Sequence, residues 1–501
     1  MTEKKNVEQS YLELVDKISQ YHEAIGLIAW DLRTGAPKKG VQRRAEVLGG
    51  LSEEAFRLQT SAEMKQLTDQ LLENEAALSE KMKRAVHESR KTYDLSTKIP
   101  PEKYRAHVVL RAEAESAWES AKESADFSVF QPYLEKLVAN TKEFLELWGY
   151  EGHPYNRLMD QFEPGVTVDV VDRVFKQVRE AIVPLLKSIQ HSSNTPKTDF
   201  LFHSFPEEEQ KAFSLNVLER MGYNFSAGRL DTTVHPFAIG LNPNDVRVTT
   251  KYDENDFRVA VFGTIHEGGH ALYEQNISED LVGTPLATGA SYGIHESQSL
   301  FWENFVGRNR AFWREHYEKL KAHAVEQFDN VSEEEFYRAI NEVKPSLIRI
   351  EADELTYCLH IMVRYEIEKG IFDGTYEVKD LPTIWNDKME EYLGIRPPDD
   401  AQGVLQDVHW SGGDFGYFPS YALGYIYAAQ FAEAMSRDFD LTDVIKNGDF
   451  SRIRKWLTTN VHQYGKMKTP RELVYDITGG SLDAAPIINY LTKKYTDIYQ
   501  L

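Results

Sequence analysis

Residues 262–276 read F-G-T-I-H-E-G-G-H-A-L-Y-E-Q-N, and the interpretation of the whole chain starts from this stretch. His266 and His270 are four residues apart, so on a helix both imidazoles leave the same face, one turn apart. Two nitrogens at this spacing can bind one metal ion, and Glu267 can hold a water molecule beside it. The pattern predicts a helical metal site with a carboxylate base.

The same five-residue pattern also arises by chance, and two histidines on the inner face of a helix can be ordinary core residues. Gly268 and Gly269 favour the metal site, because each glycine inside a helix costs about 1 kcal/mol relative to alanine. We expect the close approach of another backbone or a ligand to offset that cost.

A catalytic zinc site usually has three protein ligands and one open position. A third histidine close in sequence would require glycine and histidine where this chain has Tyr273 and Asn276. We therefore predict that a glutamate on the following helix, Glu296, is the third ligand. Glu303, one or two turns further along, is a rival, and Glu296 could instead be a first-turn residue that interacts with the helix dipole.

Composition limits the possible partners. The chain has 501 residues, 57 basic and 79 acidic side chains, and a formal net charge of −22. This balance argues against nucleic acids and anionic membranes, because phosphate binding relies on basic patches. No apolar run is long enough to span a membrane, the N-terminus has no signal-peptide character, and Cys358 is the single cysteine. We expect a cytoplasmic protein, although one cysteine is equally compatible with an exported protein of a thermophile.

Apolar residues recur at helical spacing through most of the chain, and no linker, repeat or low-complexity run divides it. The pattern predicts a mainly α fold, one large helical body in two lobes around a cleft. We expect a single domain over residues 1–501, with residues 1–150 as a helical cap and groove wall and residues 200–430 as the catalytic core.

Strand signals are confined to residues 231–237 and 245–252, which alternate and are rich in β-branched residues. They predict a small sheet beside the metal helix, whose edge could bind an extended peptide through its main chain. Residues 204–207 and 332–335 resemble capping boxes. Helices are also predicted over residues 6–30, 167–192, 332–343, 348–370, 378–393, 420–437, 450–464 and 485–498.

Six motifs together resemble the carboxypeptidase Taq family of metallocarboxypeptidases, and they occur in the family's order. They are H-P-F at residues 235–237, D-x-R-x-T at 245–249, H-E-x-x-H at 266–270, H-E-S/G-Q at 295–298, I/N-R-x-x-A/S-D at 348–353 and G-x-x-Q-D-x-H-W at 403–410. The resemblance implies a helical fold with a deep groove, similar to neurolysin and angiotensin-converting enzyme, and a homodimer. It also implies release of single residues from peptide C-termini, with broad specificity and little action on a C-terminal proline.

The resemblance assigns His266, His270 and Glu296 as ligands of one Zn²⁺ ion and Glu267 as the general base. Cobalt or manganese could replace zinc in such a site. The metal would acidify a water molecule, whose proton Glu267 would accept and pass to the leaving nitrogen. The predicted partners are peptides.

An exopeptidase must recognise a free carboxylate, which arginine can bind through two parallel hydrogen bonds. Arg247 and Arg349 are the candidates, since each lies inside a matched motif, although either could form a structural ion pair instead. We expect His235 to shape the closed end of the groove.

A glycine-rich aromatic segment over residues 409–425 suggests a flexible loop that enters a helix beside the site. Tyr421 is the predicted oxyanion donor, His409 a nearby substrate contact, and Tyr425 a further one. Aromatic packing is the alternative explanation for all three.

Two other functions stay open at this point. An oligoendopeptidase of the same helical zinc type would cleave within the chain and would lack a cationic anchor that closes the groove. A non-catalytic peptide-binding protein could retain the metal, but the presence of Glu267 argues against it.

Overall fold

The polypeptide folds almost entirely into helices, as the periodicity predicts, around one small sheet. The computed structural model describes residues 2–324 and 326–501. Among these residues no helix is both long enough and apolar enough to cross a membrane. The N-terminal part contains long helices, namely α1 (Thr2–Thr34), α2 (Val41–Gln59), α3 (Ala62–Glu73), α4 (Glu80–Thr97), α5 (Pro101–Ser124) and α6 (Phe127–Trp148).

The middle of the chain carries the sheet and the helix with both predicted histidine ligands. Its elements are α7 (Tyr155–Met159), α8 (Val168–Gln190), α9 (Glu207–Met221), β1 (Leu230–Thr232), β2 (Ala238–Asn242), β3 (Asp245–Thr250), α10 (Arg258–Gln275), α11 (Tyr292–Leu300) and a π-helical segment η6 (Phe301–Gly307). The C-terminal part is helical again. It comprises α12 (Arg310–His323), α13 (Glu333–Ile340), α14 (Tyr357–Asp373), α15 (Leu381–Leu393), α16 (Pro419–Asp438), α17 (Leu441–Lys446), α18 (Phe450–Asn460), α19 (Pro470–Thr478) and α20 (Ala485–Tyr499).

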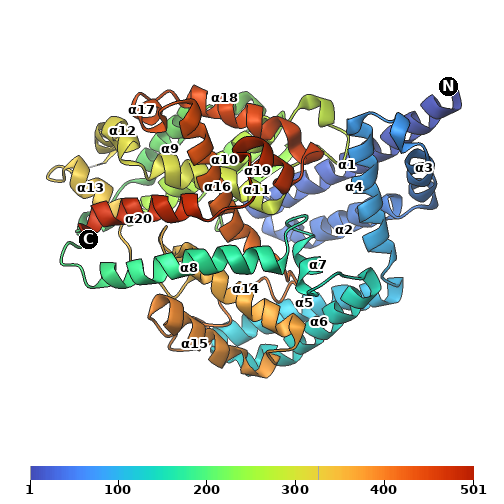
Figure 1. The fold of residues 1–501 in the computed structure, drawn as a ribbon, viewed down its shortest axis with the longest axis horizontal. Helices are drawn as coiled ribbons and strands as arrows, with labels where there is room; N and C mark the ends of the chain where they lie inside the picture. Colours follow the sequence, from blue (N-terminus) through green and yellow to red (C-terminus); the bar gives the residue numbers. More distant parts are fainter. Residues whose placement is uncertain (1, 325) are drawn as a thin grey trace.

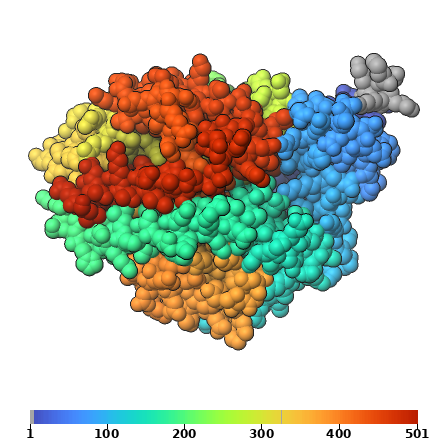
Figure 2. All heavy atoms as spheres, viewed as in Figure 1, coloured from blue at the N-terminus to red at the C-terminus, as the bar shows by residue number. Residues whose placement is uncertain are grey.

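In Figure 1, α10, α11 and α16 lie at the centre, with α1–α4 at one end of the molecule and α12 and α13 at the other. α8 runs across the molecule and packs against both α20 and α15. The space-filling view in Figure 2 shows the C-terminal segments, in red, over the place where Figure 1 labels α10 and α11, so later parts of the chain cover these helices on this face.

The sheet differs from the two strands predicted over residues 231–237 and 245–252, because the described residues form a sheet of three strands. Its order is β1-β3-β2, with β1 parallel to β3 and β2 antiparallel to it. The predicted strand over residues 231–237 is therefore wrong beyond Thr232, where Pro236 has no N–H to donate to a ladder. The strand that pairs across the turn with β3 is β2, which the sequence analysis missed.

Two other local expectations are wrong. The helix predicted over residues 348–370 begins at Tyr357, because Asp353 accepts hydrogen bonds from the backbone N–H groups of Leu355 and Thr356 and so forms a turn that competes with the helix. The capping box near Ser204 is absent, since Pro206 is the N-cap of α9. The box at Ser332 is confirmed.

Candidate active site

Helix α10 can carry two adjacent glycines because other elements pack against it at these positions. A Cβ on Gly269 would lie 2.5 Å from the carbonyl oxygen of Gln298 and 2.7 Å from Cα of Ser299, both in α11. A Cβ on Gly268 would lie 2.7 Å from the Leu218 side chain. The expected close approach of another backbone is confirmed, and it brings the two helices that carry the predicted ligands into direct contact.

Helix α11 is held from its other side and at its start. A Cβ on Gly424 of α16 would lie 2.7 Å from Cβ of Glu296, so the glycine lets α16 pack against the ligand helix. Ser291 caps the helix by accepting from the Ile294 N–H. The buried carboxylate of Glu163 accepts from the Gly293 N–H at 2.9 Å. These contacts fix the backbone position from which the Glu296 side chain extends toward the two histidines.

The three predicted ligands converge. Nε2 of His270 lies 3.3 Å from Oε2 of Glu296, and Nε2 of His266 lies 3.7 Å from the same oxygen. Within the described ranges these three residues form a group whose ligand atoms all lie within 4.8 Å of one another. Two imidazoles and a carboxylate at this separation match the donor set of a catalytic zinc site.

Glu303, the rival ligand, supports His266 from behind. Its Oε2 accepts from Nδ1 of His266 at 2.9 Å, and Arg308 donates to its Oε1 at 3.0 Å. Glu303 lies in the π-helical segment η6, where a wider turn changes the direction of side chains relative to an α-helix. Nε2, on the opposite side of the His266 ring, faces Oε2 of Glu296 at 3.7 Å.

His270 has an equivalent support that the sequence analysis did not assign. Its Nδ1 lies 2.6 Å from Nδ1 of His295, and Nε2 of His295 lies 2.8 Å from Oε1 of Glu274. The arrangement fits a relay in which His270 donates to His295 and His295 donates to the carboxylate. Such supporting partners fix the tautomer and orientation of a ligating imidazole. The spacing of Glu274, four residues after His270, was the available signal.

The carboxyl groups of Glu296 and Glu267 have pKa values shifted in opposite directions. Burial opposes ionisation of Glu296, but His266 and His270 lower its pKa to about 2. Burial raises the pKa of Glu267 to about 7, with the His266 ring opposing that rise. One carboxylate is thus poised to stay ionised as a ligand, while the other has the near-neutral pKa that suits a general base.

These residues face a cavity of about 1330 Å³. Its walls come from distant parts of the chain, including His22 of α1, residues 236–240 in and before β2, and Lys466. Arg349, Tyr417 and Tyr421 also line the cavity, together with Tyr357, whose hydroxyl lies 3.5 Å from Oε1 of Glu296. No motif or spacing pointed to Tyr357, which reaches the site only through the tertiary fold.

Of the four residues predicted to bind substrate, Arg349 lines the cavity and the other three do not. Arg349 is about 8% exposed and lines the cavity, whereas Arg247 forms a two-bond pair with its neighbour Asp245 and is not a cavity-lining residue. His235 is exposed beside the lining residues 236–240. Tyr425 is fully buried and donates to Glu354 at 2.6 Å.

His409 lies behind the cavity wall, with its Nε2 3.3 Å from the hydroxyl of Tyr421. The loop that carries it is fastened to α14, because the buried Glu368 accepts from Nε1 of Trp410 and from the Gly416 N–H, both at 2.8 Å. A Cβ on Gly416 would lie 2.6 Å from the backbone of Leu158. The glycine here serves close packing of two backbones.

A helical body whose central cavity holds two histidines four residues apart, a glutamate from the next α-helix and a second buried glutamate has the architecture of a metallopeptidase. The family model described as carboxypeptidase Taq (M32) metallopeptidase matches residues 10–495, and the chain belongs to that family. It is therefore a metallocarboxypeptidase, a peptide hydrolase.

Relatives match along their whole length. The chain is 54% identical to "Carboxypeptidase 1" of Bacillus subtilis over 99% of each protein, and 39% identical to "Thermostable carboxypeptidase 1" of Thermus thermophilus over 98% of this chain and 99% of the relative. The crystal structure of the M32 carboxypeptidase from Deinococcus radiodurans superposes with a TM-score of 0.95 at 38% identity, covering 100% of both chains.

Proposed function

We propose that this protein uses zinc to release single amino acids from peptide C-termini, with broad specificity and poor activity on a C-terminal proline. One observation carries the proposal. The Nε2 atoms of His266 and His270 converge on Glu296 in the same cavity that Arg349 lines. A metal site for hydrolysis and a cation for a free carboxylate thus share one space.

The donor set favours zinc. His266 and His270 would supply imidazole nitrogens and Glu296 a carboxylate oxygen, which leaves a position open. When bound, the ion supplies Lewis acidity, which lowers the pKa of a water molecule and polarises the scissile carbonyl. Cobalt or manganese could occupy the same donors, because geometry, ligand type and metal availability, rather than affinity alone, decide which of these metals such a site holds.

Glu267 is the proposed general base. Its carboxylate is buried next to the ligands, and its raised pKa favours holding a proton once it has accepted one from water. It would then deliver that proton to the leaving amine nitrogen. Glu296 and Glu267 can take these separate roles because the two histidines stabilise the charge of Glu296.

Arg349 is the proposed anchor for the terminal carboxylate. Among the described residues its Nη1 atom has no hydrogen-bond partner, while Nε and Nη2 lie 3.0 and 2.9 Å from Oδ1 of Asp407. Arg308, the other arginine that lines the cavity, is engaged by Glu303 and by the carbonyl of Ile340. Arg349 therefore keeps a donor for a substrate.

Tyr421 is the proposed oxyanion donor, since it lines the cavity and stacks near the guanidinium of Arg349, 4.9 Å from the ring centroid. His409 would act by holding the Tyr421 hydroxyl in place. Arg247, His235 and Tyr425 also remain proposals for substrate binding, and any contribution of theirs would be indirect because none of them lines the cavity.

The edge strand β2 provides a place for the peptide main chain. Residues 236–240, in and before β2, line the cavity, and within residues 2–324 and 326–501 the one strand paired with β2 is β3. An extended substrate could add to this edge through backbone hydrogen bonds, which do not depend on side chains. This mode of binding supports broad specificity. A C-terminal proline would place a tertiary amide, with no N–H, at the scissile bond.

Family membership also supports a homodimer in the cytoplasm. Light scattering on purified protein would test the homodimer.

The decisive experiment on activity is mass spectrometry of a digested peptide, with and without chelator. Loss of one C-terminal residue at a time, only without chelator, is the expected result. Internal cleavage would identify an oligoendopeptidase instead, and trimming by metal-free protein would overturn the proposal.

A further inference from the structure

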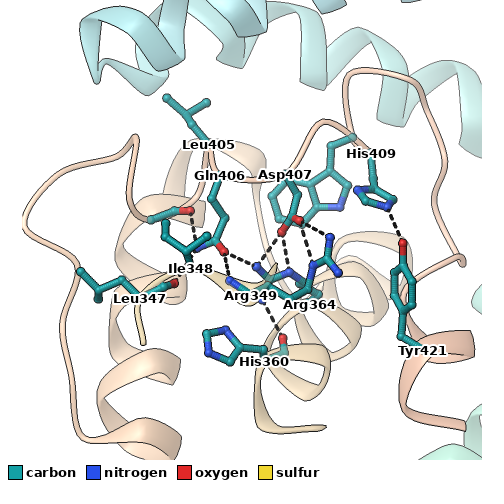
Figure 3. Close-up of polar contacts among 12 residues, drawn as sticks. Leu347, Ile348, Arg349, His360, Arg364, Leu405, Gln406, Asp407, His409 and Tyr421 are labelled. Atoms are coloured by element: carbon teal, nitrogen blue, oxygen red, sulfur yellow. Dashed lines mark hydrogen bonds and ion pairs between the residues drawn. The ribbon is translucent and has the colours of Figure 1, made fainter. Parts of the chain in front are cut away.

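A second arginine lies directly behind the proposed substrate anchor. Arg364 of α14 is fully buried, and its guanidinium stacks over Trp385 at 4.6 Å from the ring centroid. Arg364 donates from Nη1 to the carbonyl oxygen of His360 at 2.7 Å and from Nη2 to Oε1 of Gln406 at 2.7 Å. Figure 3 shows it facing the same carboxylate as Arg349.

That carboxylate, Asp407, is divided between the two arginines. Oδ1 of Asp407 accepts a hydrogen bond from Nε of Arg349. Oδ2 accepts a hydrogen bond from Nε of Arg364 at 2.6 Å and also lies 2.6 Å from Nη2 of Arg364. Although burial alone would raise the pKa of Asp407, Arg364 and Arg349 hold it well below its usual range, so the carboxylate is ionised. Two guanidinium groups and one carboxylate leave this buried cluster with one net positive charge.

The net charge matters for Arg349. If Asp407 were its only partner, the pair would be neutral, and an incoming substrate carboxylate would meet little attraction. Arg364 cancels the charge of Asp407 from the side away from the cavity. Because Arg364 is buried and is not a cavity-lining residue, it contributes charge without contacting the substrate.

We propose that Arg364 is a positioning residue that neutralises Asp407 and so leaves the charge of Arg349 available for the substrate's terminal carboxylate. This inference rests on the proposed role of Arg349. Gln406 reinforces the arrangement, since its Oε1 accepts both from Arg364 and from the backbone N–H of Arg349 at 2.9 Å. The buried pair and the cavity-facing anchor are thereby one unit.

The test compares Arg364→Met with the double variant Arg364→Met/Asp407→Asn. In the single variant Asp407 neutralises Arg349, so KM for a peptide with a free C-terminus should rise about tenfold or more while kcat changes little. In the double variant the net charge returns to one, and KM should recover most of that loss. A purely structural role predicts the opposite, a double variant at least as poor as the single one, and that result would overturn the proposal.

A second measurement reports the anchor without turnover of a peptide. The ratio of the inhibition constants of phenylalaninamide and phenylalanine measures how strongly the site prefers a free carboxylate. This ratio should fall about tenfold in Arg364→Met and return in the double variant. Arg364→Gln, which keeps a hydrogen-bonding group without the charge, should behave like Arg364→Met and replaces it if that variant does not fold.

Two controls separate the outcomes. Arg179→Met removes an arginine that is only partly buried and that pairs with Glu366 of α14 at 2.6 Å, and it should leave the acid-to-amide ratio unchanged. Arg349→Met should abolish the preference for the acid. If Arg349→Met leaves the ratio intact, the proposed anchor itself fails. If Arg349→Met lowers the ratio but the Arg364 variants leave it unchanged, only the present inference fails.

Discussion

His266 lies 2.9 Å, through its Nδ1, from Oε2 of Glu303, and this hydrogen bond depends on the π-helical turn that follows α11. The wider turn lets one carboxylate meet both the histidine and Arg308. Although burial opposes ionisation, the hydrogen bond from His266 and the charge of Arg308 lower the pKa of Glu303. An ionised acceptor makes the imidazole a better ligand. The support of the site is thus built into an irregular segment of helix.

Replacing Glu303 by alanine should weaken metal binding about 10- to 100-fold, because His266 loses the acceptor that orients its ring. Titration of the variant against a competing chelator measures this loss directly. Glu209→Ala is the matched control, since Glu209 pairs with His323 at 2.7 Å outside the metal-ligand group. Equal metal affinity in the Glu303 variant and the wild type would show that the contact is incidental.

Replacing Glu267 by glutamine should lower kcat by roughly 10²- to 10⁴-fold, because the amide cannot accept a proton from water. Metal content, measured by elemental analysis, should stay at the wild-type level, since Glu267 is not one of the converging ligands. A variant that retains its metal and turns over peptide at nearly the wild-type rate would remove Glu267 from the mechanism.

The parts of the site that follow from local geometry could be predicted from the sequence. The four-residue spacing of His266 and His270 places both on one face of α10. The adjacent glycines Gly268 and Gly269 predict that another element packs closely against this helix. Spacing left both Glu296 and Glu303 open as the third ligand, and the packing of α10 against α11 is what brings Glu296 to the two histidines.

What failed depends on contacts that no local pattern encodes. Arg364 and Asp407 are separated by 43 positions, and their pairing follows only from how the loop over residues 403–418 packs on α14. Tyr357 enters the site because Asp353 delays the start of its helix. The strand β2 was missed because its sequence, A-I-G-L-N, includes a glycine and lacks clear alternation.

Replacing Glu163 by glutamine should reduce the dependence of stability on pH. Burial raises the pKa of Glu163 to about 7, even though Ser291, Gly293 and Tyr427 all donate to it. A carboxyl whose pKa is higher in the folded than in the unfolded protein stabilises the fold at low pH and loses that contribution as pH rises from about 4.5 to about 7.

The free energy of unfolding of the wild type, relative to Glu163→Gln, should therefore fall across this interval, by at most about 1.4 kcal/mol per pH unit. Denaturant unfolding of both proteins at several pH values measures the difference. A difference that is constant between pH 4.5 and 7, or that grows with pH, would mean that the three donors hold Glu163 ionised throughout.

Replacing Gly269 by alanine should destabilise the protein and weaken metal binding together. The new Cβ would lie 2.5 Å from the backbone oxygen of Gln298, so α10 and α11 must separate, at a cost of about 1–3 kcal/mol in unfolding free energy. Gly263→Ala, on the same helix, meets nothing within 4 Å and should stabilise the protein by up to about 1 kcal/mol. Thermal unfolding should show lower stability for Gly269→Ala and higher stability for Gly263→Ala. Chelator titration should show weaker metal binding for Gly269→Ala alone. If both alanines have the same effect, helix propensity rather than the contact between the two ligand-bearing helices explains the glycines.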